Sequence, residues 1–88
     1  MELRQTQVFE HDVKKLDGSI KQRLKKSLEK IISAPTGGKP LKHFHNVFSE
    51  RIENYRLAYR VKDNEILLIC FKNRDEVYEY LKQHWQNT

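Results

Sequence analysis

The sequence predicts an α+β fold, with a two-helix hairpin packed on one face of a small, mostly antiparallel four-stranded sheet, in the order β-α-α-β-β-β-α. Three observations predict it: two neighbouring stretches with helical apolar spacing, three consecutive strand-like runs separated by two-residue turns, and a short amphipathic C-terminal segment. The 88 residues suit a single domain over residues 1–88, because a chain of this size buries only about 60–65% of its unfolded surface.

The first third of the chain predicts a short strand and the first helix. Residues 2–6 alternate weakly in polarity, as a strand start does. Phe9, Val13 and Leu16 then follow at i, i+4 and i+7, which places them on one helical face. The "DGS" sequence at 17–19 should end this helix.

A capping-box pattern, Ser19 with Gln22, predicts the start of the second helix, and Pro35 predicts its end. Its apolar stripe keeps helical spacing and consists of Ile20, Leu24, Leu28, Ile31 and Ile32. The opposite face is basic, with Lys21, Arg23, Lys25, Lys26 and Lys30. Such a run is ordinarily the solvated side of an amphipathic helix.

The second half of the chain predicts a meander and a final helix. The clearest loop is "PTGGKP" at 35–40, and the three strands that follow cover 47–52, 55–62 and 65–72. The Glu-Asn and Asp-Asn pairs between them suit two-residue hairpins, because Asn tolerates positive φ. The last strand is almost continuously apolar and should therefore be central and covered on both faces. Asp75 or Asn73 is the expected N-cap of the final helix.

Composition restricts the class of protein. No apolar run approaches the roughly 20 residues of a membrane span, and the charged N-terminus has no signal-peptide core, so we expect a cytoplasmic protein. The single cysteine, Cys70, lies in the apolar run "ILLICF" and should be a buried packing residue. The net charge of +5 favours a polyanionic partner, with a plain solvated surface as the alternative.

Strand alternation separates the arginines of "RIENYRLAYRV" from the core. In residues 55–61 the odd positions form the face beneath the helices, so Arg56 and Arg60 should lie on a second, open face of the sheet. If Glu53 and Asn54 form the turn, Arg51 pairs directly with Arg56. Directly opposed like charges destabilise a sheet unless they are solvated or bridged by an anion, so this pair predicts a phosphate or carboxylate clamp.

The sequence contains the pattern "R-I-x-x-Y-R-L-x-Y-R-V", followed by an apolar strand and "RDEVY", and it also contains "KKL" at 14–16 and "PTGGKPLKHF" at 35–44. Together these patterns resemble the RelE/ParE superfamily of bacterial and archaeal type II toxins, and RelE-type toxins most. It implies a metal-independent ribonuclease without cofactor that cuts mRNA in the ribosomal A site by attack of the 2′-hydroxyl. It also implies a RelB-like antitoxin, in a heterotetramer of two toxins and two antitoxins that reaches operator DNA only through the antitoxin.

The resemblance also implies roles for individual residues. Arg56 matches the arginine that stabilises the transition state, Arg74 a second one near the leaving oxygen, and Tyr78 the tyrosine that stacks on or orients a base. Core packing is the alternative for Tyr78. Contacts to mRNA or to 16S-type ribosomal RNA are expected from Lys39, Lys42, Arg60, Lys62 and Lys72.

One departure from the family pattern concerns the general base. The strand before "YR" often carries lysines in ribonuclease-active relatives, whereas Ser49 and Arg51 stand there in this sequence. Arg51 is counted with Arg56, Arg74 and Tyr78 among the expected catalytic residues through its position and charge. It cannot accept the proton, because arginine remains protonated. His43 and His45 are alternatives as a base or, from their H-x-H spacing, as a metal pair, and surface histidines are the simpler interpretation. The function alternatives are a ParE-like gyrase inhibitor and a weakly catalytic, antitoxin-binding co-repressor.

Overall fold

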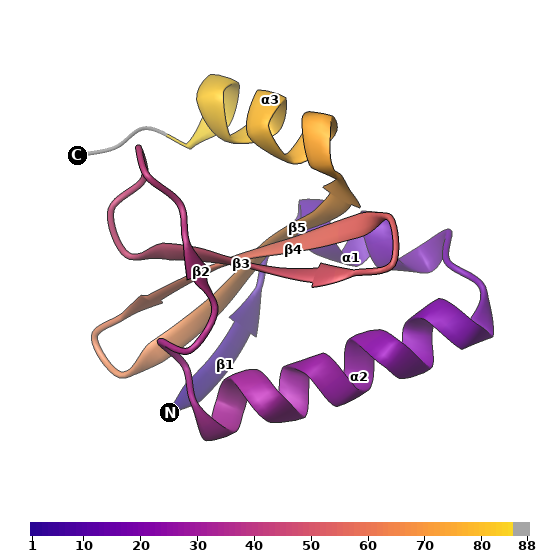
Figure 1. Cartoon of the computed structure of the whole chain (residues 1–88), viewed down its shortest axis with the longest axis horizontal. Coiled ribbons are helices and arrows are strands. Elements are labelled where there is room, and N and C mark those ends of the chain that lie inside the picture. The colour runs from indigo at the N-terminus through magenta and orange to yellow at the C-terminus, as the bar shows by residue number, and fades with distance from the viewer. Residues whose placement is uncertain (86–88) are drawn as a thin grey trace.

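The computed structural model describes residues 1–85 and confirms the α+β class (Figure 1). The elements are β1 (Glu2–Gln5), α1 (Gln7–Lys14), α2 (Gly18–Ser33), β2 (Lys39–Pro40), β3 (Val47–Ile52), β4 (Tyr55–Lys62), β5 (Glu65–Asn73) and α3 (Arg74–His84). The sheet has the order β1-β5-β4-β3-β2, and its one parallel pair is β1 with β5.

The sheet has five strands where the sequence predicted four. The additional strand, β2, contains only Lys39 and Pro40, which pair antiparallel with Ser49 and Phe48 of β3. It belongs to the stretch predicted as a loop, because two residues are too few to show an alternating pattern. The predicted strands of the meander are confirmed, with the last one extended by one residue to Asn73.

The helix starts follow local capping chemistry. Thr6 caps α1 by accepting the Phe9 N–H. Of the two N-cap candidates predicted for α3, Asn73 caps the helix by accepting the Glu76 N–H, and Asp75 lies in the first turn. The capping box predicted at Ser19 is wrong, since Asp17 caps α2 and its Oδ1 accepts the Ile20 N–H at 3.0 Å. Because the Asp17 carboxylate accepts the Ile20 N–H, the helix begins at Gly18, and Ser19 lies inside its first turn instead of at the cap.

The two faces of the sheet are both covered, which corrects the expected open face. Below the sheet, α1 and α2 enclose a core that includes Phe9, Leu24 and Leu57. Above it, Val77 of α3 packs into a second cluster with Ala58 of β4 (Figure 1). The reason is the sequence of β5, which is apolar on both sides and therefore needs a layer on each. The prediction that β5 is an inner strand covered on both faces is confirmed, since it lies between β1 and β4.

The hairpin between β3 and β4 has the predicted register. Ile52 pairs with Tyr55, and Arg51 pairs directly with Arg56. The positive φ of this turn falls on Glu53, at 56°, and not on the asparagine that was expected to carry it. The Glu53 side chain is therefore presented at the tip of the hairpin.

A close approach fixes the loop before β2 against β4. Tyr59 is fully buried and stacks on Phe48 at 5.8 Å between ring centroids. A Cβ on Gly38 would lie 2.2 Å from the Tyr59 hydroxyl oxygen, so this position accepts no side chain without a shift. Burial, with a contribution from the Glu50 charge, raises the pKa of Tyr59 to about 12, against the opposing effect of the Gly38 N–H.

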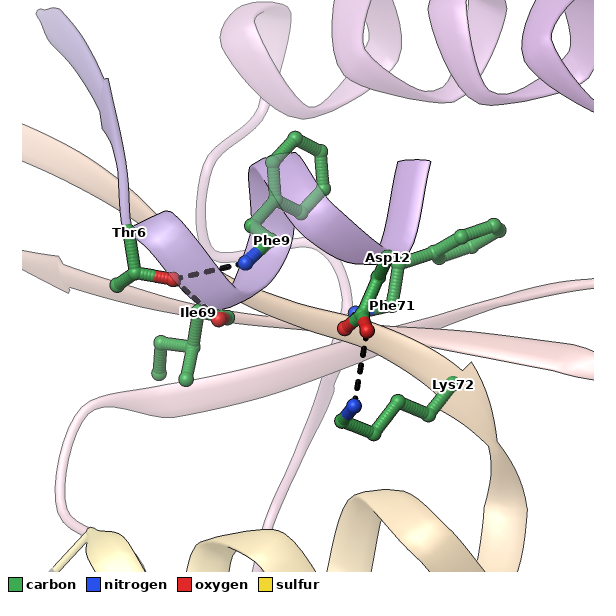
Figure 2. A network of polar contacts seen from close by, with 6 residues as sticks. All are labelled: Thr6, Phe9, Asp12, Ile69, Phe71 and Lys72. Carbon is green, nitrogen blue, oxygen red and sulfur yellow. Dashed lines mark hydrogen bonds and ion pairs between the residues drawn. The ribbon is translucent and has the colours of Figure 1, made fainter. Parts of the chain in front are cut away.

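The side chain of Thr6, the N-cap of α1, and that of Asp12 in α1 close the part of the β5 edge that β1 leaves unpaired (Figure 2). The pairing of β1 ends at Leu68. Next along β5, the Thr6 Oγ1 donates a hydrogen bond to the Ile69 carbonyl at 2.6 Å. Further along, the Asp12 Oδ2 accepts the Phe71 N–H at 3.0 Å. Two side chains of the α1 segment thus replace the backbone partners of a strand.

The same Asp12 forms a second, ionic contact. Its Oδ1 lies 2.8 Å from the Lys72 Nζ, and the Asp12 side chain is only 4% exposed (Figure 2). Burial acts to lower the pKa of Lys72, but the hydrogen bond and the charge of Asp12 outweigh it and raise that pKa. Asp12 therefore connects α1 to β5 through a hydrogen bond and an ion pair.

Candidate functional site

Three arginines from three elements line one pocket, which we call the arginine pocket. It has a volume of about 170 Å³ and lies where the β3–β4 turn meets the start of α3. The residues that line it are Arg51, Glu53, Asn54, Tyr55, Arg56 and Arg74. The predicted catalytic arginines, which are 5 and 18 positions apart along the chain, are thus brought together by the hairpin and the strand-to-helix junction.

The three guanidinium groups are positioned without neutralising partners. Arg56 is half-buried, and its Nη1 donates to the Oγ of Ser49, which is 2% exposed, at 3.3 Å. Arg51 donates from Nε to the Glu53 carbonyl at 3.2 Å. Within residues 1–85, none of the three forms an ion pair within 4.0 Å. A bound anion would offset their mutual repulsion, and the guanidinium fork matches the geometry of a phosphate.

Glu53 adds a carboxylate that the sequence interpretation missed as a site residue. It is the one acidic side chain among the residues that line the arginine pocket. Its Oε2 lies 2.7 Å from Nη1 of Arg23 on α2, and both side chains remain well exposed. The signal in the sequence is its position at the tip of a turn between Arg51 and Arg56, where turn geometry alone already accounts for it.

Tyr78 lies in a second pocket, next to the arginine pocket along α3. This pocket of about 410 Å³ lies between the loop before β3 and α3, and it is lined by Lys42, His43, Phe44, Tyr78 and Lys82. Arg74 and Tyr78 are four residues apart and therefore share one face of α3. The structure thus places Tyr78 one helical turn from Arg74, in a pocket that Phe44 also lines. Tyr78 also packs partly against the upper core.

The other predicted RNA contacts are dispersed. Lys72 is held by Asp12, with its Nζ 5.8 Å from the Tyr80 ring centroid. Arg60 lies under Trp85, with Cζ 5.5 Å from the ring centroid, and 3.7 Å from a Glu65 oxygen. Its Nε is buried without a hydrogen-bond partner in the described chain.

The remaining two, Lys39 and Lys62, are exposed on strands away from the arginine pocket. Neither is among the residues that line the pocket of Tyr78. Of the five cations predicted to contact RNA, only Lys42 lies beside one of the two pockets described above.

Other candidate groups are placed as follows. Cys70 is buried, as predicted, and burial together with the Asp12 charge raises the pKa of its thiol to about 12, with Lys72 acting oppositely. A thiol with this pKa stays protonated and is a poor nucleophile at neutral pH. Across residues 1–85, no three His, Cys, Asp or Glu side chains are grouped to hold a metal ion. That same part of the chain has no helix long and apolar enough to span a membrane.

Comparisons with known proteins give a consistent family and fold. A family model described as the ParE toxin of the type II toxin-antitoxin system, parDE, matches residues 3–78. No curated protein sequence matches. Among solved structures, a mutant of the E. coli toxin RelE in the free state has a TM-score of 0.81 at 22% identity, covering 97% of each chain. The toxin–antitoxin complex RelB-RelE from Methanococcus jannaschii gives 0.72 at 24%, covering 88% of this chain and 96% of that one.

A third structure, from a chromosomal ParDE system of P. aeruginosa, has a TM-score of 0.65 at 18% identity and covers 83% of this chain and 95% of that chain. RelE-type and ParE-type proteins are thus both among the structural relatives. At these identities the likeness establishes a shared fold.

Proposed function

The chain belongs to the ParE toxin family of type II toxin–antitoxin systems, and from this premise we propose that it is a metal-independent endoribonuclease that cleaves mRNA in the ribosomal A site. Its place as a toxin in the RelE/ParE superfamily follows from the family match and the shared fold. The observation that supports RNA cleavage is the arginine pocket, where Arg51, Arg56 and Arg74 converge without ion-pair partners within the described chain.

The proposed chemistry uses the RNA as its own nucleophile. The 2′-hydroxyl attacks the adjacent phosphorus and the bond to the 5′ oxygen of the next nucleotide breaks. The leaving oxygen takes a proton from water, and the products are a 2′,3′-cyclic phosphate and a 5′-hydroxyl. Negative charge accumulates on the phosphorane oxygens and on the leaving oxygen. Preorganised cations stabilise that charge without reorganising during the reaction. Arg56, anchored on buried Ser49, faces the phosphorane, and Arg74 faces the leaving oxygen.

In this proposal Tyr78 binds the nucleobase next to the cleaved bond. Its position, one helical turn from Arg74, suits a neighbouring nucleotide of the same strand. Aromatic side chains bind unpaired bases by stacking and by hydrogen bonding.

Glu53 accepts the proton of the attacking 2′-hydroxyl in this proposal. Arg51, which stands where a lysine base is common in relatives, cannot act as a base. Glu53 supplies the pocket with a carboxylate at the tip of the hairpin, and the ion pair with Arg23 orients it. A positioned carboxylate contributes typically about 10²–10⁴ in rate as a general base.

The variant Glu53→Gln is therefore expected to lower the single-turnover cleavage rate by about 10²-fold or more, because the amide cannot accept the proton. The rate should be measured on programmed ribosomes at neutral pH with excess protein, so that binding does not limit it. Glu79→Gln, the same change at an exposed position of α3 outside the arginine pocket, is the matched control and should cleave as the wild type does. Wild-type rates in Glu53→Gln would assign the proton to another acceptor.

An antitoxin is the expected partner, because the chain is the toxin of a two-component system. The complexes of RelB with RelE among the structural relatives support an antitoxin of the RelB type. We propose a heterotetramer of two toxins and two antitoxins, with operator DNA reached through the antitoxin.

The second candidate function, inhibition of DNA gyrase, is favoured by the ParE name of the matching family. The two functions are separated by adding purified protein to ribosomes programmed with mRNA and, in parallel, to gyrase with relaxed plasmid. If the protein is an mRNA endonuclease, primer extension should show cuts at A-site codons while plasmid supercoiling proceeds normally. Intact mRNA together with blocked supercoiling would overturn it in favour of gyrase inhibition.

A further inference from the structure

Glu53 forms its ion pair away from the arginines that surround it. It lines the arginine pocket together with Arg51, Arg56 and Arg74. Its ion-pair partner, however, is Arg23 of α2, whose Nη1 lies 2.7 Å from the Glu53 Oε2. In the described part of the chain, none of the three pocket arginines forms an ion pair. The one carboxylate of the pocket is thus held by an arginine that does not line the pocket.

The hairpin turn fixes the backbone of Glu53 beside two of the pocket arginines. Arg51 pairs directly with Arg56, and Glu53 lies in the turn between them. The Arg51 Nε also donates to the Glu53 carbonyl at 3.2 Å. The Glu53 side chain itself is 45% exposed and has room to change its rotamer. The direction of this side chain therefore decides whether its carboxylate meets Arg23 or the pocket arginines.

A carboxylate and a phosphate compete for the same guanidinium donors. Both anions accept paired hydrogen bonds from the planar fork of an arginine. A Glu53 carboxylate that turned onto Arg51 or Arg56 would occupy the donors that a phosphate needs, and it would offset one positive charge of the pocket. The ion pair with Arg23 satisfies the carboxylate elsewhere, so the pocket donors stay available to an anion from solution.

A second ion pair joins α2 to the same hairpin and serves as a comparison. The Lys30 Nζ lies 3.0 Å from the Glu50 Oε1, and Lys30 is well exposed, as Arg23 is. Neither Lys30 nor Glu50 lines the arginine pocket. Of these two pairs, only the one with Arg23 restrains a residue of the pocket.

We propose that Arg23 is a positioning residue of the arginine pocket, which holds the Glu53 carboxylate off Arg51 and Arg56 and so keeps both arginines free to bind phosphate. This inference rests on the proposed function, because it takes the arginine pocket as a phosphate site. It extends the site to α2, a helix that does not line the pocket. Without Arg23, Glu53 would become an internal competitor of the substrate phosphate.

The experiment titrates the protein with inorganic phosphate at constant ionic strength and follows binding through the NMR signals of the arginine side chains. Arg23→Gln is expected to weaken phosphate binding by about two- to fivefold, the range that an exposed ion pair supports. Arg23→Lys should bind nearly as the wild type does, because an ammonium group can still hold the carboxylate. In a Glu53→Gln background, Arg23→Gln should have no effect, because the competing carboxylate is absent.

Lys30→Gln is the matched control, since it removes one exposed cation of α2 and one ion pair to the hairpin but leaves Glu53 held by Arg23. It should leave the phosphate affinity unchanged. Equal affinities of Arg23→Gln and Lys30→Gln would overturn the role of Arg23, and so would an equal effect of Arg23→Gln with and without the Glu53 carboxylate.

The same titration separates this inference from the proposed function. If the role of Arg23 fails but the wild type cuts mRNA on programmed ribosomes, the proposed function stands alone. If phosphate binding follows the expected pattern but mRNA stays intact, the proposed function fails and the role of Arg23 stands. Pocket arginine signals that do not move when phosphate is added to the wild type would overturn the phosphate site, and with it both proposals.

Discussion

Replacing Arg56 with alanine is expected to lower the single-turnover rate of mRNA cleavage by about 10²–10³-fold, because the transition state loses a preorganised charged donor. Arg56 is the most strongly positioned of the three arginines, being half-buried and anchored on Ser49. The rate should be measured with excess protein on programmed ribosomes, so that binding does not limit it. Expression of the variant without antitoxin should correspondingly leave growth largely unaffected.

Two companion variants separate charge from geometry. Arg56→Lys keeps one positive charge but loses the planar fork, so it should recover only part of the rate. Arg4→Ala, at an exposed position of β1, should cleave as the wild type does. If Arg56→Ala is folded by its thermal transition and still cleaves at the wild-type rate, the arginine pocket is not the site of the reaction.

Replacing Asp12 with alanine is expected to lower the free energy of unfolding by about 2–4 kcal/mol. The Phe71 N–H loses its acceptor, which costs about 1–3 kcal/mol for a buried donor, and Lys72 loses its ion partner. Breaking a fully buried pair costs about 3–5 kcal/mol, but the Lys72 side chain is 24% exposed and can rehydrate in part. Urea denaturation at neutral pH measures the difference.

Two further substitutions show how much of the lost free energy of unfolding comes from the contacts of Asp12. Asp12→Asn retains an acceptor for the Phe71 N–H and removes only the charge, so its loss should be smaller than that of alanine. Glu10→Ala, on the exposed side of α1, should change stability by no more than about 0.5 kcal/mol. Equal stabilities of Asp12→Ala and Glu10→Ala would show that the edge contacts of α1 do not contribute to folding.

Much of the fold was predictable because it depends on local patterns. Alternation in residues 55–62 fixed the strand and its faces, and the two-residue turn placed Arg51 opposite Arg56, as the structure has it. The coverage of the second face was not predictable in the same way. The packing of Val77 over Ala58 joins residues far apart in sequence, and no periodicity within α3 shows which surface the helix will meet.

The candidate site was predicted in part for the same reason. The three arginines lie close to one turn and one strand end, so strand geometry brings two of them together before any tertiary contact is known. The sequence could not identify Glu53 and Phe44 as site residues, because tertiary packing brings them to the pockets. Glu53 contacts Arg23 of α2, and Phe44 lines a pocket together with Tyr78 of α3.

The side-chain closure of the β5 edge has a consequence for self-association. An unpaired strand edge is a template on which another chain can add a strand and start an aggregate. Beyond the end of β1, Thr6 and Asp12 occupy the Ile69 carbonyl and the Phe71 N–H, so this stretch offers fewer free groups to a second molecule. Loss of Asp12 would therefore do more than weaken the fold, because it would leave the Phe71 N–H free to pair with a strand of another molecule. This edge protection by Thr6 and Asp12 therefore limits strand addition between copies of the toxin that are not bound to an antitoxin.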